Sequence, residues 1–389
     1  MTPVPLKSLE LFVGAGGLAL GLSKAHVDHS AIIEWNRYAC ETIRANKRDR
    51  VHAVKDWPDP IQCDVRDVNF AEFGPVDIVS GGVPCQPFSM GGLHQAYLDP
   101  RDMFPQAIRA VHEIRPKAFL WENVRGLVRP SFANYFEYIR LRLEYPSLIA
   151  RKNEEWEKHL ARLERHRTSG GKVEYRVVAR VLDAANFGVP QRRHRVFLVG
   201  IREDLNREFS FPDETHSYDR LLFDQFVSRT YWERHRIAKK KWPSASAEQQ
   251  ARLNGLRDLF DESTRAPWKT VRDTIFDLPK PATTRRARVQ AHVFQPGARS
   301  YPGHTGSPLD EPSKALKSGV HGVPGGENAV RGEDGAIRYF TVRESARIQC
   351  FPDEFAFSGS WSEAMRQLGN AVPVDLAAAV ATRLASVLR

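Results

Sequence analysis

The first half of the chain alternates short β-rich runs with stretches of helical periodicity, and this alternation limits the fold more than any other feature. The strand candidates are 8–13, 31–35, a short segment near Cys63, 76–82 and 117–123, and the helix candidates include 18–26 and 103–114. Such alternation is typical of a parallel sheet with helices on both faces. The apolar runs 176–184 and 195–201 flank the turn-rich NFGVPQRRH and predict a hairpin that closes the sheet with an antiparallel strand. The sequence therefore predicts an α/β fold with a mostly parallel sheet.

The second half of the chain differs in character. From about residue 205 to 340 the alternation fades, Gly and Pro become frequent, and basic clusters such as TYWERHRIAKKKW are interleaved with aromatic residues. A helical pattern returns at the end, in VDLAAAVATRLASVL. We therefore expect one domain at 1–204, completed by 362–389, and a second, small and irregular domain at 205–361.

A charged helical stretch lies at 147–167. Its apolar residues are spaced seven, four and three apart and form one stripe: Ile149, Trp156, Leu160 and Leu163. The stripe predicts a solvated helix that docks on the surface of the first domain, and a contact with DNA or with a protein partner is the alternative.

The charge balance favours a polyanionic partner, nucleic acid above all, because the formal net charge is +10. The four cysteines are Cys40, Cys63, Cys85 and Cys350. They lack the paired spacing of metal ligands or of a disulfide framework, so we expect no bound metal and a reducing compartment. No apolar run approaches the roughly 20 residues of a membrane span, and the N-terminus does not resemble a secretory signal.

A glycine-rich turn follows the first predicted strand. Residues 14–19, GAGGLA, fit the G-x-G-x-x-A fingerprint, in which glycines let the backbone approach a ligand, and Glu34 lies about 20 residues further on, where it can accept from ribose hydroxyls. Trp35 can stack on an adenine or a sulfonium-bearing ligand, and Asp64 can accept from an adenine amine. The pattern predicts a nucleoside-containing cofactor without separating NAD from S-adenosylmethionine, and a plain tight turn is the alternative.

One cysteine is mounted rigidly, in the stretch GGVPCQPFS at 81–89. Pro84 and Pro87 flank Cys85 closely, and proline fixes φ and biases the residue before it toward extended structure. A cysteine in an apolar core needs no such mounting. Cys85 is therefore a candidate nucleophile.

Three polar clusters follow along the chain. Glu122 comes after the apolar run KAFLW, at the end of a strand, where open α/β sheets place their chemistry. Arg193 and Arg195 lie in QRRHR, and alternate residues of an extended segment share a face, so both can point into one cleft. The turn QLGNAVP at 367–373 can return against the glycine loop. Taken singly, the clusters are also compatible with a strand-end glutamate, a solvated basic turn and a helix cap.

Together, a thiol, a carboxyl and two guanidinium groups suit one reaction. A thiolate that adds to carbon 6 of cytosine turns the ring into an enamine, whose carbon 5 can attack a sulfonium methyl group. Glu122 would hydrogen-bond or protonate ring nitrogen 3, and Arg193 or Arg195 would hold the carbonyl oxygen at carbon 2. A free thiol with a pKa of about 8.5 is only partly thiolate at neutral pH, and nearby arginines would raise that fraction.

These motifs, in their order, resemble those of DNA (cytosine-5-)-methyltransferases of the bacterial restriction-modification type. The segments that carry the resemblance are LFVGAGGLALGL, GGVPCQPFS, DPRDMF, ENV, QRRHR, RESARIQCFPDEF and QLGNAVPV. The resemblance implies a Rossmann-like catalytic domain that binds S-adenosyl-L-methionine, a target-recognition domain at 205–361, and double-stranded DNA held between them. It implies catalytic roles for Cys85, Glu122, Arg193 and Arg195. It implies cofactor contacts by Phe12, Gly14, Gly16, Gly17, Glu34, Trp35, Asp64, Val65, Pro84, Asn370 and Ala371. Glu10 departs mildly from the family pattern, which often has Asp there.

Access to a base inside a duplex requires that the base be extruded. The segment 89–99, which carries two glycines, predicts a loop that closes over the DNA. The predicted DNA contacts are Gln86, Ser89, Arg101 and Lys314, and the residues expected to hold phosphates are the lysines at 239–241 with Arg285, Arg286 and Arg288. The recognised DNA sequence does not follow from one chain, because base readout depends on side-chain aim.

Other functions fit parts of the sequence. A tRNA cytosine-5 methyltransferase shares the catalytic motifs, although the basic second domain favours DNA. An NAD-dependent oxidoreductase would use the glycine loop but leaves Cys85 and Glu122 without a joint role. A catalytically silent DNA-binding regulator would need none of the chemical groups. We expect a monomer in the bacterial cytoplasm, associated with the nucleoid, with a cognate restriction endonuclease as a possible functional partner.

Overall fold

The structure is a computed structural model of the 389-residue chain and describes residues 5–84, 102–255, 265–284, 288–299, 305–318 and 328–389. The chain divides into two compact units. The first comprises Met1–Leu182, His194–Pro212 and Ala377–Arg389, and the second comprises Asp183–Arg193 and Asp213–Leu376.

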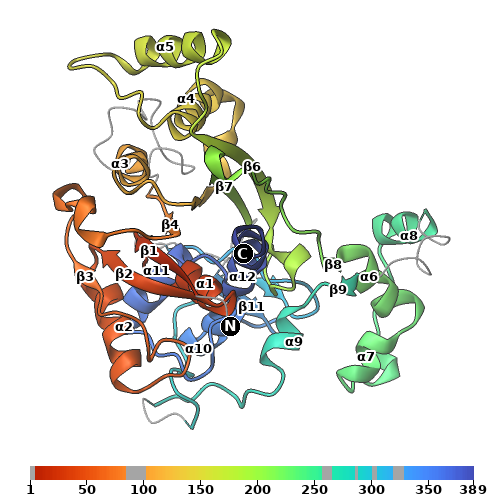
Figure 1. Cartoon of the computed structure of the whole chain (residues 1–389). Coiled ribbons are helices and arrows are strands. Elements are labelled where there is room, and N and C mark those ends of the chain that lie inside the picture. The colour runs from red at the N-terminus through yellow and green to blue at the C-terminus, as the bar shows by residue number, and fades with distance from the viewer. Residues whose placement is uncertain (1–4, 85–101, 256–264, 285–287, 300–304, 319–327) are drawn as a thin grey trace. The chain divides into compact units, whose positions relative to one another are not determined.

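The first unit contains a seven-stranded sheet with the strand order β3-β2-β1-β4-β5-β7-β6 (Figure 1). The strands are β1 (Leu6–Leu11), β2 (Val27–Glu34), β3 (Ile61–Gln62), β4 (Ile78–Gly82), β5 (Ala118–Val124), β6 (Tyr175–Asp183) and β7 (His194–Arg202). The strands β3, β2, β1, β4 and β5 pair in parallel, and β7 pairs with β5 antiparallel. The predicted α/β fold, with a mostly parallel sheet closed by an antiparallel strand, is confirmed.

Helices connect the parallel strands and cover the sheet. They are α1 (Gly17–Lys24), α2 (Arg37–Arg48), α3 (Phe104–Ile114), α4 (Ala133–Glu144) and α5 (Trp156–Thr168). Phe119 and Trp121 of β5 are fully buried in one cluster with Phe104 of α3. Leu120, which points to the opposite face of the sheet, and Ile78 of β4 are equally buried. Both faces are therefore covered, as in other parallel sheets.

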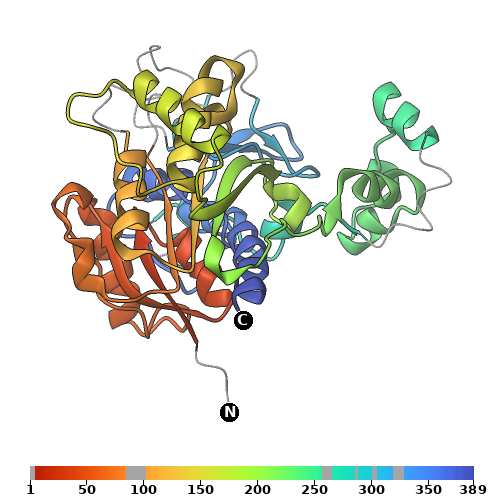
Figure 2. The same cartoon turned by 45° about the horizontal axis from the view of Figure 1, so that its top comes forward.

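The end of the chain returns to the first unit through α12 (Val374–Leu388). A Cβ atom on Gly21 of α1 would overlap Ala377 of α12, so the glycine allows the two helices to approach closely. Figure 2 shows the last turns of α12 beside α1. Among the described residues, the stretch Trp361–Leu388 has the length and hydropathy of a membrane span, and 61% of its apolar window is buried inside the protein, as in a core helix.

The charged helix α5 docks on the first unit, as its apolar stripe predicts. Trp156 and Leu163 pack into the cluster that also contains the side chains of α4. His159 is fully buried, and its Nδ1 lies 3.0 Å from the hydroxyl of Tyr138 on α4. Ile149 does not belong to the stripe, because it precedes the helix and is 57% exposed.

The second unit is built from short elements. Its strands form a three-stranded sheet of β10 (Ser307–Pro308), β11 (Ala329–Arg331) and β12 (Ile337–Tyr339), and a pair of β8 (His216–Ser217) and β9 (Ala266–Pro267). Its helices include α6 (Tyr218–Leu222), α7 (Thr230–Arg234), α8 (Ala247–Asn254), α9 (Val271–Ile275), α10 (Val342–Ile348) and α11 (Trp361–Asn370). These short elements agree with the irregular character that the sequence predicts for this region.

The boundaries of the two units differ from the expected domains 1–204, 205–361 and 362–389. The segment Asp183–Arg193 and the helix α11 belong to the second unit. Both segments contact the second unit through buried polar side chains such as Arg193, which donates to backbone carbonyl groups of α11 and of the loop at Leu316.

Candidate active site

Two glycines end strand β4 and bring its backbone against both neighbouring strands. A Cβ atom on Gly81 would overlap the carbonyl oxygen of Leu11 on β1, and one on Gly82 would lie 3.2 Å from Oε2 of Glu122 on β5. Close approach of the backbone therefore requires glycine at position 81, and glycine at position 82 avoids a tight contact with the carboxyl group. It leaves room for the carboxyl group of Glu122 at the end of β4.

Glu122 forms a buried ion pair with Arg195. Arg195 lies opposite Val124 in the antiparallel pairing of β5 and β7, which makes Glu122 its diagonal neighbour. The Nε atom of Arg195 lies 2.7 Å from Oε1 of Glu122, and the two side chains are 13% and 7% exposed. Burial lowers the pKa of Arg195, and the charge of Glu122 opposes that effect. A charge-assisted contact of this kind holds the carboxyl group in one orientation.

The end of β5 also fixes the segment that leads to Cys85. The side-chain amide of Asn123 donates to the carbonyl oxygen of Val83 at 3.0 Å, and the Val83 N–H donates to the carbonyl oxygen of Glu122 at 3.2 Å. Pro84, a predicted cofactor contact, comes next. Cys85 itself lies outside the described residues, as do Gln86, Ser89 and Arg101.

The glycine loop turns at two glycines with positive φ. Gly14 and Gly16 have φ values of +56° and +95°, in the left-handed region that favours glycine. Gly17 begins helix α1. The carboxylate of Glu34, at the end of β2, accepts from the N–H groups of Gly14 and Asn36, both at 2.7 Å. Glu34 therefore holds the loop from the neighbouring strand.

The remaining predicted cofactor residues of the first unit lie near the ends of β1, β2 and β3. Phe12, directly after β1, has a φ of +53° and packs against the main apolar cluster. Trp35, directly after β2, is 66% exposed. Asp64 caps the turn that begins with the buried Val65, and it accepts from Nε of Arg66 at 2.9 and 3.0 Å. Hydrogen bonds from Arg66 lower the pKa of Asp64.

Arg193 has a different environment from Arg195. It precedes β7, so the alternation of a strand does not govern its direction. Its guanidinium group donates to the carbonyl oxygens of Leu316, Gly369 and Ala371, and the side chain is 1% exposed. These contacts favour a positioning role for the predicted catalytic Arg193, because they fix the backbone around Asn370.

Two glutamines complete this buried group, and the sequence analysis missed them as functional candidates. Gln349, at the end of α10, donates to the carbonyl oxygens of Leu368 and Ala371. Gln191 accepts from the Leu316 N–H at 2.8 Å and donates to Gln349 at 3.1 Å. Both lie inside motifs that carry the family resemblance, QRRHR and RESARIQCFPDEF. Their place in these motifs could have identified them as candidates from the sequence. Asn370, a predicted cofactor contact, is itself exposed at the end of α11.

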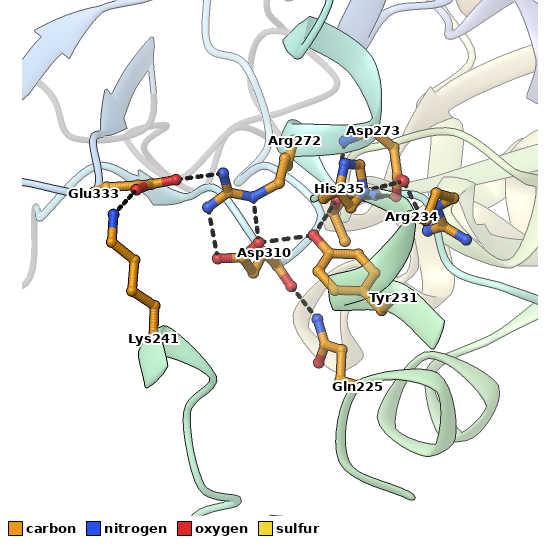
Figure 3. Close-up of polar contacts among 10 residues, drawn as sticks. Gln225, Tyr231, Arg234, His235, Lys241, Arg272, Asp273, Asp310 and Glu333 are labelled. Atoms are coloured by element: carbon orange, nitrogen blue, oxygen red, sulfur yellow. Dashed lines mark hydrogen bonds and ion pairs between the residues drawn. The ribbon is translucent and has the colours of Figure 1, made fainter. Parts of the chain in front are cut away.

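A second polar network in the same unit involves, apart from Lys241, residues that the sequence analysis did not single out (Figure 3). Asp310 accepts from Arg272 at 2.6 and 3.1 Å and from the hydroxyl of Tyr231 at 2.8 Å. Arg272 also donates to Glu333, which pairs with Lys241 at 3.2 Å. Lys241, one of the lysines expected to hold phosphates, is therefore engaged in an ion pair of this network. The side chain of Lys314 is partly exposed, and its backbone N–H donates to Ser307.

Comparison with known proteins identifies the family. A profile of the family described as C-5 cytosine-specific DNA methylase matches residues 6–145 and 150–386. Type II methyltransferase M.NgoMIV of Neisseria gonorrhoeae is 30% identical over 386 residues, which cover 98% of each protein. Type II methyltransferase M.Eco47II of Escherichia coli is 31% identical over 380 residues, which cover 96% of this chain and 77% of the relative.

Solved structures share the fold. The S. pombe Dnmt2 methyltransferase aligns over 98% of each chain with a TM-score of 0.57 and 18% identity. A mutant of Spodoptera frugiperda DNMT2 aligns over 98% of this chain and 99% of that chain with a TM-score of 0.57 and 16% identity. At these identities the likeness concerns the fold alone. The family profile covers nearly the whole chain, so the chain belongs to the C-5 cytosine-specific DNA methylase family.

Proposed function

We propose that the chain transfers a methyl group from S-adenosylmethionine to carbon 5 of a cytosine extruded from double-stranded DNA, through a transient bond to Cys85. The observation that carries the proposal is the Glu122–Arg195 pair at 2.7 Å, at the end of β5 and against the glycine pair of β4. Cys85 follows that glycine pair by three residues. The pair supplies an oriented carboxyl group at the carboxyl ends of parallel strands, where open α/β sheets place their ligands.

The residues around the glycine loop fit S-adenosylmethionine. A carboxylate has about four acceptor positions, so Glu34 can accept from ribose hydroxyls while it holds the Gly14 and Asn36 N–H groups. Trp35 exposes 66% of its surface and can stack on the adenine, whose amine can donate to Asp64. A Cβ atom on Gly14 would meet no atom within 4 Å, so the loop borders open space. The bound cofactor would supply an electrophilic methyl group at its sulfonium.

In the proposed reaction the thiolate of Cys85 adds to carbon 6 of cytosine, and Glu122, after it takes up a proton from solvent, gives that proton to nitrogen 3. Carbon 5 takes the methyl group, with S-adenosylhomocysteine as the leaving group. A base then removes the proton from carbon 5, the carbon–sulfur bond breaks, and nitrogen 3 returns its proton to Glu122. Arg195 keeps the carboxyl group of Glu122 in place throughout, and a positioned acid of this kind contributes about 10²–10⁴ in rate.

DNA is the substrate that the family implies, and a basic second unit suits a polyanion. The two relatives above are both named type II methyltransferases, which supports a role as the modification enzyme of a restriction-modification system. We place the enzyme in the bacterial cytoplasm as a monomer. A tRNA substrate remains the second candidate, because the same catalytic residues would serve it.

Methyl transfer to duplex DNA and to tRNA, measured side by side with radiolabelled S-adenosylmethionine, tests the proposal. We expect label in DNA only, recovered as 5-methylcytosine at one short sequence. Cys85→Ser should bind S-adenosylhomocysteine as the wild type does and transfer no label. Label in tRNA alone, or in an exocyclic amine of DNA, would contradict the proposed substrate or the proposed carbon. A rise in melting temperature with NAD rather than S-adenosylhomocysteine would favour the oxidoreductase alternative.

A further inference from the structure

A buried polar network lies under the glycine loop of the first unit, and the proposed reaction does not use it. Its members are Ser8 and Glu10 of β1, Ser23 of α1, His29 of β2, Ser80 of β4, and Trp57, which lies between α2 and β3. We call these six residues the Glu10–His29 network.

The centre of the network is a buried carboxylate beside a buried imidazole. Oε1 of Glu10 lies 3.3 Å from Nδ1 of His29, and each side chain is 1% exposed. The hydroxyl of Ser80 donates to Oε2 of Glu10. Oε1 has no conventional hydrogen bond, so the nearby Nδ1 atom is the group that compensates its burial. Ser8 also contacts Nδ1, at 2.8 Å.

The hydrogens of the network can be assigned so that the donors follow one direction, from Trp57 through Ser23 to His29. The indole N–H of Trp57 can only donate, and it donates to the hydroxyl of Ser23 at 3.0 Å. The Ser23 hydroxyl lies 2.9 Å from Nε2 of His29 and can donate to it. His29 then carries its hydrogen on Nδ1, which faces the hydroxyl of Ser8 at 2.8 Å and the carboxylate of Glu10 at 3.3 Å. This assignment gives every donor an acceptor.

Trp57 in turn supports the glycine loop. A Cβ atom on Gly16 would lie 3.0 Å from two carbon atoms of the Trp57 ring, so the ring packs directly on the Gly16 backbone. The ring centre of Trp57 lies 4.8 Å from that of His29, edge to face. The N–H of Gly16 donates to Val13, and the carbonyl oxygen of Gly16 accepts from Leu20. The tryptophan therefore buttresses the residue at which the loop turns into α1.

We propose that the Glu10–His29 network is a positioning device for the cofactor loop: Glu10 orients His29, His29 holds Ser23, and Ser23 fixes the indole that packs on Gly16. The inference rests on the proposed function for the identity of the ligand, but not for the mechanical role. The residues act through Trp57 and have no part in the methyl transfer itself. The same carboxylate binds Ser80, so the network also joins β1 to the strand that leads toward Cys85.

The variants that test the proposal remove single links. Trp57→Phe keeps an aromatic ring on Gly16 and removes the N–H, and His29→Ala removes the link between Glu10 and Ser23. The matched control is His159→Ala. It deletes an equally buried histidine of α5, whose hydrogen-bond partners Tyr138 and Leu148 do not belong to the network. All three variants are measured as full-length protein without DNA.

The first measurement is amide hydrogen exchange in the absence of any ligand. We expect faster exchange at Gly16 and Leu20 in His29→Ala and Trp57→Phe, and wild-type exchange there in His159→Ala. The second is the affinity for S-adenosylhomocysteine by calorimetry, which should weaken by about 3- to 10-fold in the first two variants, the effect of one ordinary hydrogen bond. A general loss of stability would affect the control as well.

Unchanged exchange at Gly16 and Leu20 in both network variants would overturn the proposal, even if His29→Ala lowers the melting temperature. If the wild type binds no S-adenosylhomocysteine, the proposed function fails, and the exchange measurement still decides the role of the network. If exchange accelerates but affinity stays the same, the network does not position the cofactor, and that result also overturns the proposal.

Discussion

The two units of the chain are stabilised by different kinds of contact. In the first, one continuous cluster of apolar side chains runs from the strands of the sheet to α3, α4 and α5. In the second, the described clusters around Tyr231 and Phe340 contain five buried residues each, and charged side chains such as Arg193 and Arg272 join segments that are far apart in the sequence.

The difference shows what an ion pair does in each unit. Glu122 and Arg195 lie on adjacent strands whose geometry the sheet already sets, so their contact orients a reactive group. Arg272 and Asp310 lie on short elements that no large core fixes, so their contact helps to define the fold itself. Loss of the first pair should therefore affect the chemistry, and loss of the second should affect stability.

The largest expected effect comes from Glu122→Gln. The amide keeps the size of the side chain but cannot give a proton to nitrogen 3, so the rate of methyl transfer should fall by about 10²–10⁴. The variant also leaves the buried charge of Arg195 without its carboxylate, so the urea midpoint should fall, and the rate is measured well below the unfolding transition. Single-turnover assays with duplex DNA measure the rate, and Asp310→Asn is the matched control in the second unit. A control variant that loses as much rate at saturating DNA would break the distinction between the units.

Arg193→Met should mainly destabilise the second unit. The guanidinium binds three backbone carbonyl groups in a buried setting, and their loss should cost about 3 kcal/mol or more. Unfolding in urea measures the effect. The neighbouring Arg192, whose side chain is 56% exposed, provides the control, and Arg192→Met should cost about 1 kcal/mol or less. Equal stabilities would instead favour a role for Arg193 at the base.

Acid should weaken the charge network of the second unit. Burial alone would raise the pKa of Asp273, but hydrogen bonds from His235 and Thr270 outweigh it and lower that pKa to about 2. The stabilisation is complete above the unfolded pKa, about pH 4, and is lost as the pH falls toward 2. A difference of this size corresponds to about 2 kcal/mol.

Unfolding at pH 5 and pH 3 checks this expectation. The wild type should lose more stability between the two pH values than Asp273→Asn, which has no carboxylate to protonate. Identical losses in both proteins would show that the network around Asp273 contributes nothing to stability.

The smallest expected effect is a difference between two neighbouring lysines in the salt dependence of DNA affinity. Lys241 pairs with Glu333 at 3.2 Å, whereas Lys240 is exposed. If Lys240 binds a phosphate, Lys240→Ala should reduce the slope of log affinity against log salt concentration by about 0.9, and Lys241→Ala should leave the slope unchanged. Fluorescence anisotropy at several salt concentrations measures both. The reverse result would show that DNA displaces Glu333 from Lys241.

The sequence predicted the sheet of the first unit because its signals are local. Alternating apolar runs, the glycines at 14 and 16, and Glu122 at a strand end all follow from periodicity or from short motifs. The sequence also predicted the docking of α5, apart from Ile149, which lies outside the helix.

The contacts of the second unit could not be predicted in the same way. Arg193 binds residues more than 120 positions away, and a strand pattern predicted that it would share a face with Arg195. The Glu10–His29 network joins five segments through single polar contacts, for which no periodicity exists. Side-chain hydrogen bonds between distant segments depend on the finished fold and leave no local pattern in the sequence.

The central claim is that Cys85 bonds to carbon 6 of the target cytosine. A duplex that carries 5-fluorocytosine at the methylated position tests it most directly, because fluorine cannot leave carbon 5 as a proton does. Incubation with S-adenosylmethionine should give a stable protein–DNA adduct, and mass spectrometry should place it on Cys85. Full methylation of the unmodified duplex by a preparation that forms no adduct with the fluorinated one would contradict the account.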